Sequence, residues 1–267
     1  IPDWLRMTAE GRLEEAYAMP PSRPDTGLVY ADTDNRGVTF GFVDTVTHTG
    51  DLLFCSVLKY QAARELAALY AEIGDGEGAQ DCRDRAETLK RAIDVTFPAV
   101  DGLLRASTGA SAQPDVWGTA YAVYVGALTP GKKAAACRAL ANAYDAGTLA
   151  WRGNIRHVRI TDDFSDATMW ERALAAKNTY QNGAYWGTPV GWVVYAIARI
   201  DRPMAARLAR EYLAELREGD FRNGPESGSP WECMHPDGNH RQNPVYLTSV
   251  SCPLAAFVRL DREGAAP

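Results

Sequence analysis

Residues 50–97 read GDLLFCSVLKYQAARELAALYAEIGDGEGAQDCRDRAETLKRAIDVTF, and this stretch decides the expected fold. Its first half carries apolar residues at three- and four-residue steps, the period of a helix with one buried face, and stops at Gly74. A second stripe of the same period follows and ends at Pro98. Because residues 74–76 are the whole connection, the two helices must lie antiparallel.

The same hairpin unit recurs downstream. DVWGTAYAVYVGAL at 115–128 precedes Thr129 and Pro130, a helix cap and a first helical residue, and VGWVVYAIARI at 190–200 precedes another helix. Further helical patterns lie at residues 1–19, 166–180 and 245–260, which gives about nine helices and no comparable run of strands. We therefore predict an all-α protein, an (α/α) toroid of antiparallel hairpins that is a complete or partial (α/α)6 barrel and forms one domain over residues 1–267.

Composition narrows the classes of function. The net charge is -6 without a basic cluster, which argues against nucleic acid as a partner. The 5 cysteines and 4 histidines are scattered, so we expect no metal site and no cofactor. No apolar run is long enough to span a membrane, and we expect a cytoplasmic protein with no membrane partner. The chain opens at Ile1, which leaves an upstream segment open, and the oligomeric state is not predicted.

Long connections separate the short-turned hairpins. They cover residues 20–50, 99–113, 148–165 and 218–243, and they are rich in aromatic residues and glycine turns. In an up-down array, the connections between hairpins emerge at one end. We therefore expect one functional face, built of ordered loops over a helical scaffold.

Aromatic and amide side chains concentrate in YQNGAYWGTPVGW, residues 180–192. Such rings pack on the apolar faces of sugars, and amides bind sugar hydroxyls. A plainer interpretation is that the rings cap the end of the core. As a set they favour an oligosaccharide or glycoside as the partner, and the candidate binding residues are Tyr180, Gln181, Asn182, Tyr185, Trp186, Trp117 and Trp231.

Chemistry on a glycosidic bond requires two opposed carboxyl groups. Asp44 has apolar neighbours and no obvious structural duty, whereas Asp51 and Asp115 each precede a helix and are expected to be caps. Glu232 stands between Trp231 and a cysteine, an unusual setting for an exposed glutamate. Asp44 and Glu232 are therefore the candidate catalytic pair, with Asp51 and Asp115 as alternatives to Asp44.

Four segments resemble one known family. They are QPDVWGTAYAVYVG (113–126), GAYWGTPVGWVVYAIA (183–198), ECMHPDG (232–238) and VYLTSVSCPLAAFVRL (245–260). The chain resembles the six-hairpin (α/α)6-barrel glycosidases, which include trehalases, processing α-glucosidases and mannosylglycerate hydrolases. The resemblance implies hydrolysis with inversion, with Glu232 as the base and Asp44 as the general acid. The count of helices also implies that an upstream hairpin is missing or was not recognised.

Other functions stay open. Arg156 and His157 in WRGNIRHVRI recognise a sugar carboxylate or sulfate in one interpretation, and in the other the arginines pair with Asp162 or Asp163. A sugar epimerase or isomerase would use His48 with His157 or His235, and a polysaccharide lyase would use the segment RGNIRH, residues 152–157. A non-catalytic carbohydrate-binding protein would keep the aromatic platform without an opposed carboxylate pair.

Overall fold

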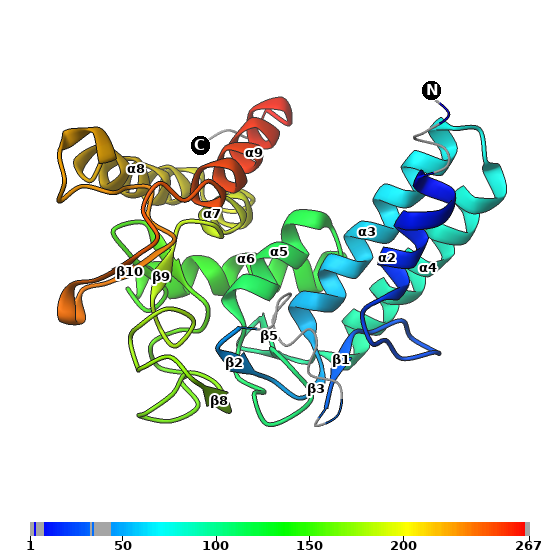
Figure 1. The fold of residues 1–267 in the computed structure, drawn as a ribbon, viewed down its shortest axis with the longest axis horizontal. Helices are drawn as coiled ribbons and strands as arrows, with labels where there is room; N and C mark the ends of the chain where they lie inside the picture. The colour runs from blue at the N-terminus through cyan, green and yellow to red at the C-terminus, as the bar shows by residue number, and fades with distance from the viewer. Residues whose placement is uncertain (1–2, 4–7, 33, 35–43, 265–267) are drawn as a thin grey trace.

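The computed structural model describes residues 3, 8–32, 34 and 44–264. The helix hairpins predicted from the sequence are present in it (Figure 1). Helix α3 (Leu53–Glu72) pairs with α4 (Gly76–Thr96), α5 (Val116–Val125) with α6 (Pro130–Asp145), and α7 (Val190–Ala198) with α8 (Arg202–Glu218). The chain also forms a π-helical turn η1 (Thr8–Leu13), α2 (Glu14–Ala18) and the last long helix α9 (Thr248–Arg262). The periodicity thus located the long helices correctly.

Local capping explains where several helices begin. Three aspartate carboxylates each accept a hydrogen bond of 2.8–2.9 Å from a backbone N–H group in the first turn of the helix. The pairs are Asp75 with Gly78, Asp115 with Gly118, and Asp201 with Met204. Pro130 is the first residue of α6 as predicted, but Thr129 caps it without a side-chain hydrogen bond. Asp51 is not the cap of α3. That position belongs to Leu52, and Asp51 instead forms an ion pair with Arg23 at 2.6 Å.

The core is formed mainly by helices that are apolar on all sides. Every residue of α7 is buried, and only Tyr124 among the residues of α5 is not. Helix α7 packs against α5, α8 and α9, and α5 also packs against α3. This central position explains the uninterrupted apolar runs, since a helix covered all round needs no polar face.

The all-α prediction is wrong. The described residues contain eleven strands in four sheets, and the largest is a five-stranded antiparallel sheet in the order β11-β10-β9-β7-β6. Its strands are β6 (Ala150–Trp151), β7 (Asn154–Arg156), β9 (Tyr185–Trp186), β10 (Cys233–His235) and β11 (His240–Gln242). The fold is therefore mixed α and β rather than an all-α toroid. Strands of two or three residues are too short to show a two-residue alternation, which is why the sequence did not reveal them.

Three two-stranded sheets complete the strand content. They are β1 (Tyr30–Ala31) with β3 (Gly50–Asp51), β2 (Val46–Thr47) with β8 (Arg172–Ala173), and β4 (Ala99–Val100) with β5 (Leu103–Leu104). Short 3-10 turns lie at η2 (Phe221–Asn223) and η3 (Asp237–Asn239). In Figure 1, β9 and β10 lie below α7 and α8, and β1, β2, β3, β5 and β8 lie along the lower side of the molecule.

The helix predicted at 166–180 is also wrong. Asn182 holds this segment as a loop, because its side-chain oxygen accepts from the Met169 N–H at 2.7 Å and its Nδ2 donates to the Ala175 carbonyl at 2.9 Å. The segment contributes β8 instead of a helix.

In the described part of the chain, none of the helices combines the length and apolar character needed to cross a bilayer.

Candidate active site

The five-stranded sheet brings distant predicted residues into one place. Trp186 stands opposite both Cys233 and Ile155, and Tyr185 stands opposite Met234 and Arg156. Loops at the end of this sheet then carry Tyr180 and Glu232. The sheet, which the sequence did not predict, is therefore the element that assembles the site.

Tyr180 links the early loop to this sheet. Its hydroxyl donates to Asp44 Oδ2 at 2.5 Å, and its N–H donates to His240 Nε2 at 3.2 Å. Its ring packs 5.2 Å from that of Trp186, centroid to centroid. Burial, the hydrogen bond to Asp44 and the negative charge of Glu232 all raise the Tyr180 pKa. The phenol therefore stays protonated near two carboxylates that are far apart in sequence.

Glu232 is held on the inner side of this cluster. Its side chain is buried, with 4% of the residue exposed, and its Oε2 accepts a 2.5 Å hydrogen bond from Asn243 Nδ2. Its backbone N–H donates to the carbonyls of Gln242 and Asn243. Burial raises the pKa of nearby Tyr246, and the Glu232 charge raises it further. Asp44, by contrast, is exposed, so one carboxylate faces solvent and the other faces the protein.

Gln181 and Asn182 are buried, and their side-chain oxygens hold neighbouring loops. Gln181 Oε1 accepts from the Thr45 N–H at 3.0 Å and from Thr45 Oγ1 at 2.7 Å. Because residues 180 and 181 bind residues 44 and 45 respectively, this double contact fixes Asp44 beside Tyr180. Asn182 supports the neighbouring loop as described above. Both amides therefore hold the loops that carry the candidate site residues.

Trp117 and His157 belong to a buried aromatic cluster. The two rings stack with centroids 3.5 Å apart, and Trp186 meets Trp117 edge-on at 5.5 Å. His48 packs 4.2 Å from Trp170, which also lies 5.9 Å from His157.

The two histidines of this cluster are only 1% and 2% exposed. Burial lowers the pKa of His48 to about 3 and lowers that of His157 well below its usual range, where the nearby His48 and Arg156 add to the effect. Both rings are therefore neutral core residues, which argues against the acid-base histidine pair of an epimerase.

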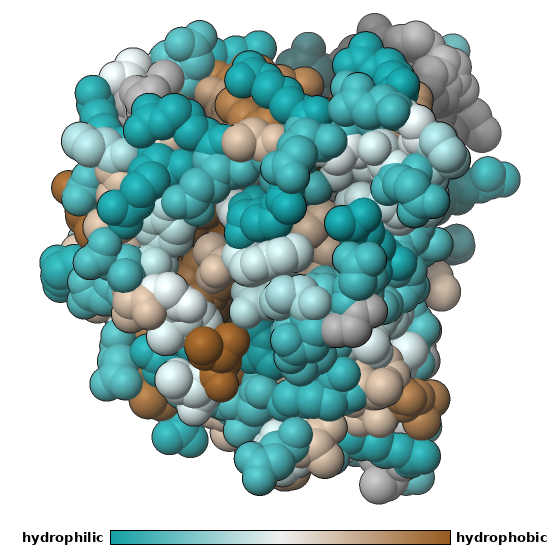
Figure 2. Space-filling model, turned by 90° about the vertical axis from the view of Figure 1, so that its left-hand side faces the viewer, coloured by the Kyte–Doolittle hydropathy of each residue, from teal (hydrophilic) through white to brown (hydrophobic). Residues whose placement is uncertain are grey.

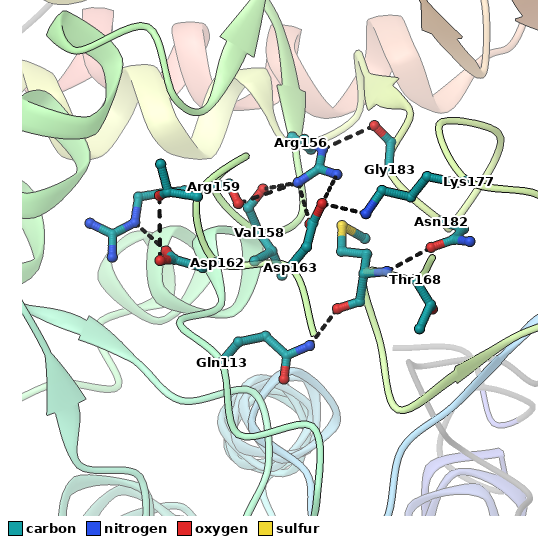
Figure 3. A network of polar contacts seen from close by, with 12 residues as sticks. Gln113, Arg156, Val158, Arg159, Asp162, Asp163, Thr168, Lys177, Asn182 and Gly183 are labelled. Atoms are coloured by element: carbon teal, nitrogen blue, oxygen red, sulfur yellow. Dashed lines mark hydrogen bonds and ion pairs between the residues drawn. The ribbon is translucent and has the colours of Figure 1, made fainter. Parts of the chain in front are cut away.

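Arg156 forms the structural ion pair that the sequence left open (Figure 3). Its guanidinium binds both oxygens of Asp163, at 2.7 and 3.0 Å, and its Nε donates to the Gly183 carbonyl at 3.1 Å. Lys177 binds the same carboxylate at 2.5 Å. With 2% of Arg156 exposed, its charge holds the loops under β9 together and is not presented to a ligand.

The Tyr185 and Trp231 rings are in contact with other groups. The Tyr185 ring packs against His235 at 5.4 Å and Trp151 at 6.2 Å. Trp231 lines a separate cavity with Trp151. Among the alternatives to Asp44, Asp51 is engaged by Arg23, and Asp115 is the buried cap of α5.

Sequence reasoning missed three residues of the cluster, Thr45, Asn243 and Tyr246. Their polar side chains stand in loops without a motif, and only their contacts with Gln181 and Glu232 reveal a role. No group of three or more His, Cys, Asp or Glu side chains in the described residues is arranged to hold a metal ion.

Comparison with known proteins supports the fold. No family model matches the chain, and no curated protein matches it in sequence. A solved structure named sialidase aligns with a TM-score of 0.59 and 13% identity, over 86% of this chain and 21% of the sialidase chain. The chain thus has the fold of a segment that makes up about a fifth of that protein's length, and this match does not by itself show the six-hairpin group.

Proposed function

We propose that the protein is a glycoside hydrolase that uses Asp44 and Glu232 as its catalytic carboxylates. One observation carries the proposal: the hydroxyl of the half-buried Tyr180 donates to Asp44, and the charge of Glu232 raises the pKa of the same hydroxyl. Two carboxyl groups separated by most of the chain therefore belong to one cluster beside Trp186. The fold shared with part of a protein named sialidase is consistent with this proposal.

The contacts suggest a role for each carboxyl group. Tyr180 binds Oδ2 of Asp44, which leaves Oδ1 to carry the proton that passes to the leaving oxygen as the C–O bond breaks. Asn243 binds Oε2 of Glu232, and Oε1 is then the oxygen that takes a proton from water as that water attacks the anomeric carbon. This sequence of bond changes inverts the anomeric configuration.

Substrates that differ in their leaving group test the two roles separately. A poor leaving group needs the general acid, whereas 4-nitrophenolate leaves without a proton. We expect Asp44→Asn to lower kcat/KM by about 10²–10⁴-fold on oligosaccharides and far less on 4-nitrophenyl glycosides, and Glu232→Gln to lower both. The matched control is Asp51→Asn, which alters an aspartate of β3 that pairs with Arg23.

Two results would contradict the proposal. Equal losses of Asp44→Asn on both substrate types would remove Asp44 as the acid, and retention of configuration in NMR spectra of the first product would remove the inverting mechanism. Sugar binding without turnover by the wild-type protein, over a panel of oligosaccharides and 4-nitrophenyl glycosides, would favour the non-catalytic binding protein.

A further inference from the structure

A second cavity lies where the five-stranded sheet meets the end of α8. It is partly open and has a volume of about 110 Å³. Its lining includes two tryptophans, two arginines and three glutamates: Trp151, Trp231, Arg152, Arg241, Glu215, Glu218 and Glu226. A single bound water needs ~10–15 Å³ of such space, so the cavity holds several waters or one small polar ligand. Trp231 and Glu232 are consecutive, but Trp231 lines this cavity whereas Glu232 binds Asn243.

Its walls combine aromatic rings with charged groups. The Trp151 and Trp231 rings are partly exposed, and each has a guanidinium about 6 Å from its centroid, from Arg152 at 5.8 Å and from Arg241 at 5.9 Å. Arg152 also pairs with Glu218 at 2.6 Å. Because each guanidinium lies over its ring, the cavity offers the remaining aromatic surface together with hydrogen-bond donors held close to it.

Glu215 supplies an acceptor at the inner wall. The residue is 4% exposed, and its Oε1 accepts a 2.5 Å hydrogen bond from Ser229 Oγ. Burial is the main cause of the raised pKa of this carboxyl. A buried acid of this kind favours a hydroxyl partner over a second charge, because a charged partner would also have to be desolvated.

We propose that this cavity binds one neutral pyranose unit, as a carbohydrate site separate from Asp44 and Glu232. The sugar's C–H face lies on a tryptophan, and its hydroxyls bind Glu215 and the arginines. Figure 2 shows the side of the molecule that carries α8 and β10, and this side is largely hydrophilic with only small apolar patches. Such a surface fits a small polar ligand better than a protein partner.

The test uses free D-glucose, D-galactose and D-mannose as probes, with saturation-transfer NMR and titration of tryptophan fluorescence. Trp151→Ala and Glu215→Ala are each expected to weaken binding at least about tenfold, whereas Glu215→Gln retains it because glutamine keeps a side-chain oxygen that accepts a hydroxyl hydrogen bond. The matched control, Phe164→Ala, removes a half-exposed aromatic ring elsewhere and leaves binding unchanged. Circular dichroism and thermal melting confirm that each variant folds, and Arg241→Ala replaces any that does not.

The outcome is independent of the proposed hydrolysis when the titration is repeated in the Asp44→Asn, Glu232→Gln double variant. Binding that persists there and is lost with Trp151→Ala supports the second site, whether or not the wild type turns over. Binding that disappears only in the double variant would overturn the proposal. Stronger binding of D-glucosamine than of D-glucose, lost with Glu215→Gln, would replace the neutral sugar by a cationic ligand and would also overturn it.

Discussion

Tyr180 donates a 2.5 Å hydrogen bond to Asp44, although 136 residues separate them in the chain. The adjacent contact between Gln181 and Thr45 runs in parallel and fixes the register of the two loops. The proposed acid is thus held by a side chain that also experiences the charge of the proposed base. This relationship makes Tyr180 a positioning residue whose removal has a defined consequence.

Tyr180→Phe is expected to lower kcat by about 10- to 100-fold with little change in KM. The variant loses a hydrogen bond to a charged group, which is worth about 1.5–3 kcal/mol, but keeps the ring beside Trp186. Steady-state kinetics on an oligosaccharide measure the effect. Tyr185→Phe is the control, since Tyr185 packs on His235 instead, and an equal loss there would contradict a specific role for Tyr180.

Asp115→Asn is expected to stabilise the protein above neutral pH. Burial raises the pKa of Asp115 from its ordinary value of 3.8 to about 7, so between these values the folded state keeps a proton that the unfolded state releases. Stability therefore falls as pH rises through this window, by an amount on the order of 4 kcal/mol. Asparagine also caps helices, so the variant keeps the helix cap and avoids the free-energy cost of ionising a buried carboxyl group.

Urea denaturation at pH 4 and pH 8 checks this expectation. The wild type and Asp115→Asn should have similar free energies of unfolding at pH 4 and diverge at pH 8. Asp75→Asn, at the half-exposed cap of α4, should change stability by less than about 1 kcal/mol at both pH values. If the difference in free energy of unfolding between Asp115→Asn and the wild type were the same at pH 8 as at pH 4, the raised pKa of Asp115 would be contradicted.

His48 and His157 are expected to make the protein acid-sensitive. Because the pKa of each is lowered on folding, the unfolded state takes up protons below about 6.5 that the folded state does not. Stability is therefore lost as pH falls from about 6.5 towards 3, at about 1.4 kcal/mol per pH unit for each histidine. The slope is measured in the Asp115→Asn background, because Asp115 acts in the opposite direction. His48→Gln should reduce the slope of stability against pH by the contribution of one proton, about 1.4 kcal/mol per pH unit. An unchanged slope would show that His48 is protonated in the folded state.

Asp163→Asn is expected to destabilise the protein by about 3–5 kcal/mol, since it leaves the buried Arg156 charge without its carboxylate. Arg207→Ala removes an exposed partner of Asp145 and of the Tyr144 hydroxyl, and its effect on stability should be much smaller. Thermal or urea denaturation of the two variants gives the comparison. Equal, small effects would mean that Arg156 is available to a ligand after all.

Gly153→Ala is expected to disrupt the β6–β7 hairpin. Gly153 has a φ of +76°, and a Cβ there would stand 2.3 Å from the backbone nitrogen of Tyr212 in α8. Gly147→Ala is the control, because Gly147 has a φ of +68° but no atom within 4 Å of its added Cβ, so it should cost only about 1 kcal/mol of backbone strain. The variants are compared by melting temperature, and similar losses would mean that the α8 contact yields without cost.

The sequence by itself determined the three long hairpins and the last helix, because three- and four-residue apolar steps, Gly74, Pro130 and the capping aspartates act locally. It also named Asp44 and Glu232 as candidate catalytic residues and Tyr180 as a candidate binding residue. Only the tertiary structure decided that short strands pair into a five-stranded sheet, and that Arg156 meets Asp163 while Tyr180 meets Asp44. Strand pairing and loop contacts join residues far apart in the chain, so no short-range pattern records them.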